Sequence, residues 1–175
     1  MLKTTILCLA LLLLLAACNG GEQAAGPETG LPAGPFPFEF TTTDLGGNQV
    51  SDATLEEREL FFVYFWTTWC PACVNSMPGL AQLANEFDDR VGFISLLGDY
   101  ATARDTAVRI TRDAEVPFIT VDAHLPQLSE LLQLVQSGFL PTSVIIDANG
   151  DVVGSQIVGG GTDRIRTAIE DALSR

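Results

Sequence analysis

The feature that most limits the fold of this chain is an unbroken run of apolar and aromatic residues, LFFVYFW, at positions 60–66. A strand with one face in water alternates polar and apolar side chains, whereas a continuous apolar run is typical of a strand buried on both faces. Covering both faces of a sheet requires other layers of secondary structure. The run therefore favours an α/β fold with residues 60–66 as a central strand.

The remaining patterns complete an α/β sandwich around this strand. Alternation at 36–40, a turn cluster at 44–48 and residues 49–51 predict an N-terminal β-hairpin. Hydrophobic periodicity predicts strands at 91–97, 118–121, 143–147 and 152–158, and helices at 71–87, 102–114, 128–135 and 162–174. The Asn149-Gly150 turn predicts a hairpin between the last two strands, and Pro78 predicts a kink in the first helix. This order predicts a mixed central sheet flanked by helices.

Residues 1–17 have the pattern of a signal peptide. Lys3 precedes an apolar run at 6–17 that is too short to span a bilayer as a helix. The run ends in Leu-Ala-Ala followed by Cys18, which resembles the lipobox of bacterial lipoproteins; the alternative is an ordinary cleavage site before a cysteine. The resemblance implies that Cys18 is lipidated and anchors the protein outside the cytoplasm, on the cell membrane or the outer membrane.

The segment after Cys18 predicts a tether rather than a folded unit. Residues 18–35 are rich in Gly and Pro and contain no aromatic residue before position 36, so they bury too little surface to fold. Residues 36–175 then form a single folded domain. The formal net charge is -13, and Lys3 is the only lysine. A nucleic-acid surface needs a basic patch, so the sequence predicts no nucleic-acid partner.

Four cysteines sort into two pairs by position. Cys8 is removed with the signal peptide and Cys18 is taken by lipid, which leaves Cys70 and Cys73 in a Cys-Pro-Ala-Cys motif. Such a motif is a redox couple, half of a zinc site or a structural staple. Zinc needs four ligands, and only His124 is left to add one. A disulfide across two residues closes too small a loop to stabilise the chain much. The motif therefore favours redox chemistry.

Three segments carry a resemblance to a known family. They are FWTTWCPAC at 65–73 with Pro78 in the following helix, GFLPT at 138–142, and IDANG at 146–150. Over residues 36–174 the chain resembles the TlpA/ResA branch of membrane-anchored disulfide reductases in the thioredoxin superfamily. The resemblance implies a thioredoxin-like fold with an N-terminal β-hairpin and a central αβ insertion at 102–121.

The resemblance also implies roles for individual residues. Cys70 begins a helix, whose N–H groups and dipole stabilise a thiolate, so Cys70 is expected to be exposed and to attack a partner disulfide. Cys73, one helical turn later, is expected to resolve the mixed disulfide. Trp69 and Pro71 flank the nucleophile and are expected to contact the substrate. The family implies a cis Pro141 that, with Leu140, pairs with a substrate strand; the alternative is a proline that only marks the start of a strand.

The partners implied are exported proteins with disulfides, including apocytochrome c, and a membrane thiol donor; no cofactor and no metal are expected. The direction of electron flow stays open, because an oxidant or isomerase uses the same pair. A copper protein of this fold resembles a Cys-x-x-x-Cys spacing with a distant histidine, which fits poorly here. A related peroxidase needs a lone cysteine after Pro-x-x-x-Thr, and that pattern is absent.

The chain departs from the family at two positions that normally carry acidic residues near the buried cysteine. Ser76 stands three residues after Cys73, and Tyr64 stands six residues before Cys70. A proton acceptor for the buried thiol must then be a water or a carboxylate from elsewhere, such as Asp99 or Glu39.

Overall fold

The computed structural model describes residue 31 and residues 33–175. Its main sheet has five strands in the order β5-β4-β3-β6-β7. These strands are β3 (Leu60–Trp66), β4 (Val91–Leu97), β5 (Ile119–Asp122), β6 (Thr142–Asp147) and β7 (Ile157–Val158). Because β3 pairs in parallel with β4 and antiparallel with β6, the sheet is mixed, as expected. A separate hairpin is formed by β1 (Thr41–Thr43) and β2 (Gln49–Ser51).

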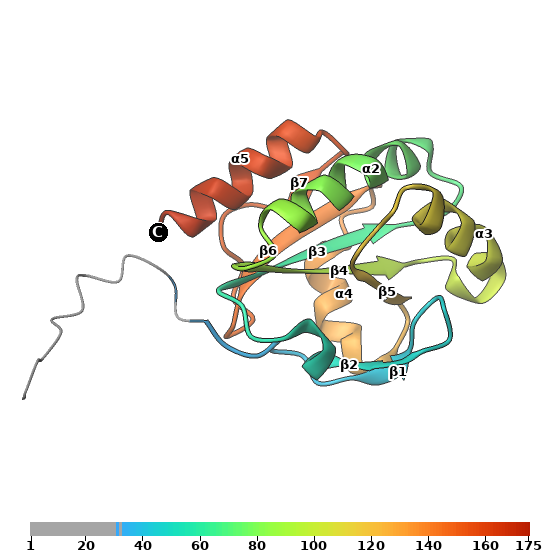
Figure 1. The fold of residues 1–175 in the computed structure, drawn as a ribbon, viewed down its shortest axis with the longest axis horizontal. Coiled ribbons are helices and arrows are strands. Elements are labelled where there is room, and N and C mark those ends of the chain that lie inside the picture. The colour runs from blue at the N-terminus through green and yellow to red at the C-terminus, as the bar shows by residue number, and fades with distance from the viewer. Residues whose placement is uncertain (1–30, 32) are drawn as a thin grey trace, which may run out of the picture.

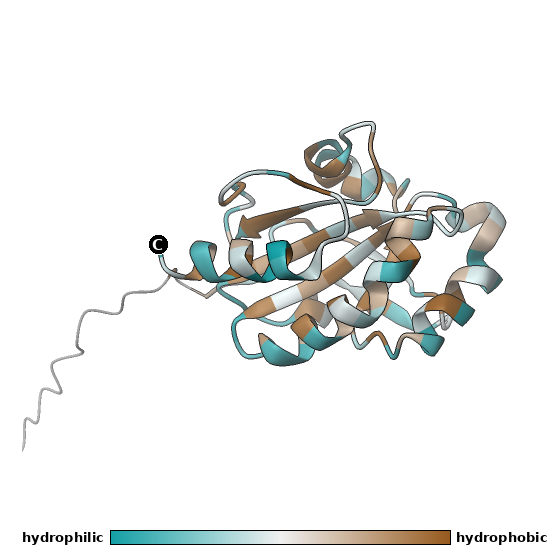
Figure 2. Ribbon diagram, turned by 90° about the horizontal axis from the view of Figure 1, so that it is seen from above, coloured by the Kyte–Doolittle hydropathy of each residue, from teal (hydrophilic) through white to brown (hydrophobic). Residues whose placement is uncertain are grey.

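Helices cover both faces of this sheet (Figure 1). The helices are α2 (Pro71–Glu86), α3 (Tyr100–Asp113), α4 (Ser129–Val135) and α5 (Thr162–Leu173), with short 3-10 turns η1 (Asp52–Leu55) and η2 (Pro126–Leu128). One core cluster joins the sheet to α2, α3 and α5, and a second joins it to α4 and the N-terminal segment. The hydropathy of the ribbon follows this arrangement, with apolar strands between amphipathic helices (Figure 2).

The central strand β3 supplies side chains to both clusters. Leu60, Phe62, Tyr64 and Trp66 point toward α2 and α5, whereas Phe61 and Val63 point toward α4. This division follows from the two-residue period of a strand. All six side chains are fully buried. The prediction of a strand buried on both faces is therefore confirmed.

Two predicted strands have different limits in the structure. The first strand of the hairpin is Thr41–Thr43 rather than residues 36–40, because Phe36 and Phe40 turn inward to fill the second cluster. The predicted strand at 152–158 is reduced to a bridge between Ile146 and Val152 and to β7. Gly154, with a φ of 87°, turns the chain between these two pieces, which a regular strand does not allow.

Helix α2 continues through Pro78 to Glu86 as one element. A break in helical geometry occurs instead in α3, where Ala103 has φ -131° and ψ 15°. The predicted limits of β3 and β4 agree with the structure, and those of α2, α5 and β6 agree to within one residue.

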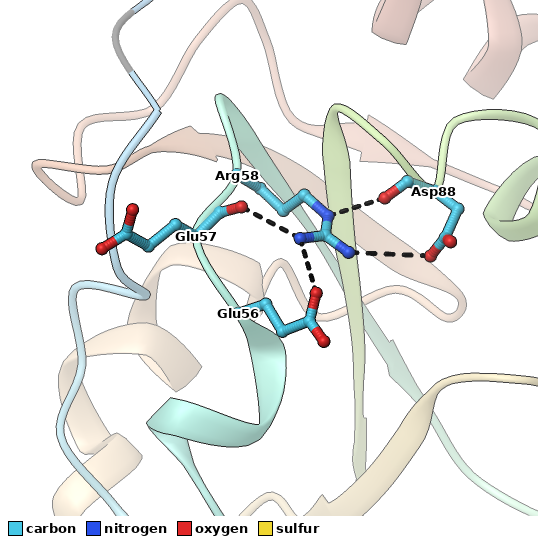
Figure 3. A network of polar contacts seen from close by, with 4 residues as sticks. All are labelled: Glu56, Glu57, Arg58 and Asp88. Atoms are coloured by element: carbon cyan, nitrogen blue, oxygen red, sulfur yellow. Dashed lines mark hydrogen bonds and ion pairs between the residues drawn. The ribbon is translucent and has the colours of Figure 1, made fainter.

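Arg58 joins the N-terminal segment to the end of the sheet that lies away from the cysteine motif. Gly34 and Arg58 exchange two backbone hydrogen bonds of 3.0 Å. The Arg58 guanidinium donates to the carbonyl of Asp88 at 2.6 Å, to the carboxylate of Glu56 at 3.0 Å and to the carbonyl of Glu57 at 2.9 Å (Figure 3). The backbone pair thus joins the N-terminal segment to Arg58, and the side-chain contacts hold Arg58 in place.

The expected signal peptide at 1–17 and the expected lipidation site Cys18 lie outside the described residues, as does most of the expected tether at 18–35. Within the described part, Leu31 packs against the first core cluster, and Gly34 pairs with Arg58. Contacts with the domain thus begin before the boundary expected at residue 36. Over residue 31 and residues 33–175, no helix combines the length and apolar character needed to cross a membrane.

Candidate active site

The two cysteines of the motif lie at the start of α2, immediately after the loop that leaves β3. Cys70 is the N-cap residue of α2, with extended backbone angles, and Pro71 occupies the first helical turn. Proline fits there because the first N–H groups of a helix have no intrahelical acceptor. Cys70 and Cys73 form a disulfide, with their Cα atoms 5.3 Å apart.

The sulfur of Cys70 occupies the position of a helix-capping group. The backbone N–H of Cys73 donates to Sγ of Cys70 at 3.2 Å. The first N–H groups of a helix have no acceptor within the helix, and together with the positive end of the helix dipole they favour a negative charge at this position. In the reduced protein the same contact would stabilise a thiolate on Cys70.

Exposure differs between the two cysteines and their neighbour Trp69. Cys70 is 6% exposed and Cys73 is fully buried, whereas Trp69 is 69% exposed. Cys70 is less exposed than expected, because in this oxidised state its sulfur is bonded to that of the buried Cys73. Of the pair, only Cys70 has any exposed surface.

The second motif of the sequence lies at the same end of the sheet. The Leu140–Pro141 peptide bond is cis, as expected. Phe65 of β3 pairs with Thr142 of β6, so Pro141 lies beside the end of β3 from which the cysteine loop begins. Leu140 packs against the core cluster that contains both cysteines. The fold therefore brings the two motifs together from positions about seventy residues apart in the printed sequence.

Phe139 is a residue of this region that the sequence analysis missed. It is 67% exposed and lies two residues before Pro141. The loop that carries it is held by Thr142, whose hydroxyl donates to the Phe139 carbonyl at 2.7 Å. The sequence feature that could have identified it is a large apolar residue in the loop between Gly138 and Pro141, because loops lie at the surface and rarely bury their side chains. Among the described residues, Trp69 and Phe139 are the most exposed aromatic side chains.

The two positions that lack the family's acidic residues have structural partners. The Tyr64 hydroxyl donates to the Cys73 carbonyl at 3.2 Å, and burial raises the pKa of Tyr64 well above its ordinary 10. The Ser76 hydroxyl lies 2.7 Å from the Ala72 carbonyl and 2.9 Å from the Gly160 carbonyl. A Cβ on Gly160 would lie 1.8 Å from the Ser76 oxygen, so α2 and the Gly160 loop pack without space between them. Neither side chain is a base for Cys73.

The two carboxylates considered as replacements lie in different places. Asp99 accepts hydrogen bonds from Thr68, in the loop before Cys70. Glu39 is exposed between Phe38 and Phe40, whose side chains pack in the cluster on the α4 side of the sheet. Because α2 covers the other face, Glu39 is not a neighbour of Cys73, and the suggestion that it accepts the thiol proton is wrong.

His124 lies in the loop after β5 and is exposed, as expected. Its Nε2 atom is 3.1 Å from the Gly98 carbonyl. Across residue 31 and residues 33–175, no three His, Cys, Asp or Glu side chains lie close enough together to hold a metal ion.

Comparison with known proteins gives a consistent result. The model of the AhpC/TSA family matches residues 33–155. The thiol-disulfide oxidoreductase ResA of Bacillus cereus is 27% identical over 121 residues, which are 69% of this chain and 66% of the relative. The chain therefore spans slightly less than two thirds of the length of this curated relative. The resemblance to ResA proteins that the motifs indicated is confirmed.

Solved structures confirm the thioredoxin-like fold. A thiol:disulfide interchange protein of the thioredoxin family from Chlorobium tepidum has a TM-score of 0.64 and 24% identity, covering 81% of this chain and 98% of that protein. A secreted disulfide oxidoreductase of Mycobacterium tuberculosis has a TM-score of 0.60 and 19% identity, covering 75% of this chain and 95% of that protein.

Proposed function

This chain belongs to the AhpC/TSA family, and we propose that it is a thiol–disulfide oxidoreductase that reduces disulfides of exported proteins through Cys70 and Cys73. One observation carries the proposal: the two cysteines are disulfide-bonded at the N-terminus of α2, where the Cys73 N–H donates to the Cys70 sulfur. The ResA relatives, which are named thiol-disulfide oxidoreductases, support it.

The reaction begins with the reduced protein. The Cys70 thiolate attacks one sulfur of a substrate disulfide, the substrate S–S bond breaks, and its electron pair passes to the departing substrate sulfur, which takes up a proton. Cys73 then loses its proton and attacks Cys70 Sγ. The second substrate thiol leaves, and the Cys70–Cys73 disulfide forms. Two electrons pass from the cysteine pair to the substrate.

Cys70 is the attacking residue in this proposal because it caps the helix and retains some exposed surface, whereas Cys73 is fully buried. Only an accessible sulfur can meet the sulfur of a folded partner. The buried Cys73 reaches only Cys70, and this restricts it to the second step.

Substrate contacts are assigned to the surface around Cys70. Trp69 and Pro71 flank the nucleophile in sequence, and Leu140 and Pro141 lie at the same end of the sheet. An extended substrate segment that pairs with the backbone at Leu140 would gain main-chain hydrogen bonds without requiring a particular sequence. The exposed aromatic ring of Phe139 extends this apolar surface.

The proposal places the domain outside the cytoplasm, because the N-terminal pattern is that of a lipoprotein signal. Residues 1–17 are removed, Cys18 carries lipid and anchors the protein to the cell membrane or outer membrane, and the residues between Cys18 and Leu31 act as the tether, since Leu31 and Gly34 already contact the domain. A membrane thiol donor then returns electrons to the pair. Apocytochrome c is one substrate that fits this location.

A trapping experiment tests the roles of the two cysteines. The purified protein is assayed for reduction of insulin disulfides with dithiothreitol as donor, alongside Cys70→Ser and Cys73→Ser. We expect Cys70→Ser to abolish turnover. Cys73→Ser that is reduced, freed of dithiothreitol and then mixed with insulin should accumulate a mixed disulfide that peptide mapping assigns to Cys70. Turnover that survives in Cys70→Ser, or a mixed disulfide on Cys73 in that variant, would contradict the assignment.

A further inference from the structure

Asp99 uses its side chain in an unusual way for its position. It is the N-cap residue of α3, yet its carboxylate caps no N–H of that helix. Aspartate is favoured at an N-cap because its side chain accepts the N–H of the second or third helical residue. Here only the Asp99 backbone carbonyl serves α3, accepting the N–H groups of Thr102 at 3.1 Å and Ala103 at 2.9 Å. The carboxylate is free for another partner.

That partner is Thr68, in the loop between β3 and α2. The Thr68 N–H lies 3.1 Å from both carboxylate oxygens of Asp99, and the Thr68 hydroxyl donates to one of them at 2.5 Å. Hydrogen bonds to an ionised acceptor are about twice as strong as neutral ones. Both residues are partly buried, so water competes less for these contacts than at an open surface.

The contact acts on the segment that presents the nucleophile. Thr68 is two residues before Cys70, so their Cα atoms are at most about 7.6 Å apart. Among the described residues, Asp99 is the only side chain that hydrogen-bonds the loop at 67–69; the Thr67 hydroxyl is buried without a partner, and Trp69 is largely exposed. The loop thus depends on Asp99 for its side-chain anchoring.

Asp99 is itself held in place. The N–H of the preceding Gly98 donates to the Trp66 carbonyl at 2.9 Å, which continues the pairing of β3 with β4. The Gly98 carbonyl lies 3.1 Å from Nε2 of His124. On the other side, the Tyr100 hydroxyl donates to the Thr43 and Asp44 carbonyls, each at 3.2 Å. Because Asp99 is held by the sheet on one side and by the hairpin on the other, its hydrogen bonds can keep the loop at 67–69 in one conformation.

We propose that Asp99 is a positioning residue of the reaction, which holds the loop from Thr67 to Trp69 so that Cys70 meets a partner disulfide in a productive orientation. The inference rests on the proposed role of Cys70 as the attacking cysteine. Asp99 does not touch the sulfur; it acts through Thr68. Such a role was invisible in the sequence, because the two residues are 31 positions apart.

The test compares Asp99→Ala, Asp99→Asn and a control, Asp147→Ala. Asp147 also holds a turn through its carboxylate, accepting the N–H groups of Asn149 at 2.8 Å and Asp151 at 3.0 Å. It pairs with Leu60, at the end of the sheet away from Cys70. The control therefore removes a comparable set of hydrogen bonds without affecting the cysteine loop.

The readout is the rate at which the reduced full-length protein forms a mixed disulfide at Cys70 with dithiobis(nitrobenzoate), in the Cys73→Ser background, followed by peptide mapping. We expect Asp99→Ala to lower this rate about tenfold, because a loop released from its Thr68 hydrogen bonds holds Cys70 in the productive orientation for less of the time. Asp99→Asn keeps an acceptor for the Thr68 N–H and a donor for its hydroxyl, so it should restore the rate to within about threefold. Asp147→Ala should leave the rate unchanged.

An unchanged rate in Asp99→Ala, or an equal loss in Asp99→Asn and Asp99→Ala, would overturn the inference. Urea unfolding of each variant shows whether a variant with a low rate is still folded under the assay conditions. Failure of the proposed function gives a different result. In that case the wild-type protein would not reduce insulin, while the rates at Cys70 would still rank the Asp99 variants.

Discussion

The hydroxyl of Tyr64 donates a hydrogen bond to the backbone carbonyl of Cys73 at 3.2 Å, in a region where both residues are fully buried. Tyr64 lies on β3, six residues before Cys70, and its hydrogen bond joins β3 to the first turn of α2. Burial raises the pKa of Tyr64 well above its ordinary 10, because a phenolate there would lose its hydration. Tyr64 therefore stays a neutral hydrogen-bond donor at the pH where an ordinary tyrosine begins to ionise.

This state of Tyr64 can be measured by absorbance titration. The chain has two tyrosines, Tyr64 and Tyr100, so a Tyr100→Phe variant reports on Tyr64 alone. We expect no tyrosinate absorbance around pH 10, where a free tyrosine ionises, until circular dichroism shows unfolding. Reversible ionisation near pH 10 in the folded variant would contradict the buried hydrogen bond.

Thr67 provides a prediction on stability. Its hydroxyl is buried and, within the described residues, has no hydrogen-bond partner, and an unpaired buried polar group is costly. Valine has the same shape without the hydroxyl, so Thr67→Val should raise the free energy of unfolding by about 1 kcal/mol in urea titrations. A loss of stability in this variant would mean that the hydroxyl has a partner in solution.

Phe139 provides a prediction on substrate recognition. Because its ring is 67% exposed, Phe139→Ala should change the free energy of unfolding by no more than about 0.5 kcal/mol. If the ring binds protein substrates, kcat/KM for insulin should fall severalfold, while the rate with dithiobis(nitrobenzoate) stays the same. Val152→Ala is the matched control, since Val152 is also exposed but follows the turn at the other end of β6. Equal effects of the two substitutions on insulin reduction would refute this role.

Glu59 provides a prediction on pH dependence. Hydrogen bonds from Arg90 lower the pKa of Glu59 below its ordinary 4.5. Since the pKa is lower in the folded state, the pair stabilises the protein above the ordinary value, and this contribution disappears as the pH falls through the folded value. The pair is partly exposed, so its contribution is less than about 1 kcal/mol.

The measurement is urea unfolding of the wild-type protein and Glu59→Gln between about pH 6 and pH 3. The wild-type protein should be the more stable at pH 6, and the difference should shrink toward acid. A difference that is constant over this range would show that Glu59 titrates alike in the folded and unfolded chains.

The parts of the fold that were predictable are those where local pattern and burial agree. Residues 60–66 and 91–97 are buried on both faces, so their apolar runs indicated the exact limits of β3 and β4. The start of α2 followed from Pro71. The alternation at 36–40 was misleading, because Phe36 packs edge-on against Phe61 with ring centroids 5.1 Å apart, without joining a strand.

The candidate site was predictable to the extent that its residues form motifs. The Cys70–Cys73 spacing indicated a redox pair, and the family resemblance indicated the cis bond before Pro141. The pairing of Thr68 with Asp99 was not predictable, because it depends on how the ends of β3 and β4 meet. The exposed position of Phe139 likewise follows from the loop around it rather than from its own side chain.

The most direct test of the account is the reduction potential of the Cys70–Cys73 couple, measured by equilibration with glutathione buffers and quantified by thiol labelling. A protein that reduces exported substrates needs a couple that gives up electrons readily. We therefore predict a potential more negative than about -200 mV. A potential above about -200 mV, toward the strongly oxidising end of the range, would contradict the proposed reductase and favour an oxidant or isomerase that uses the same cysteines.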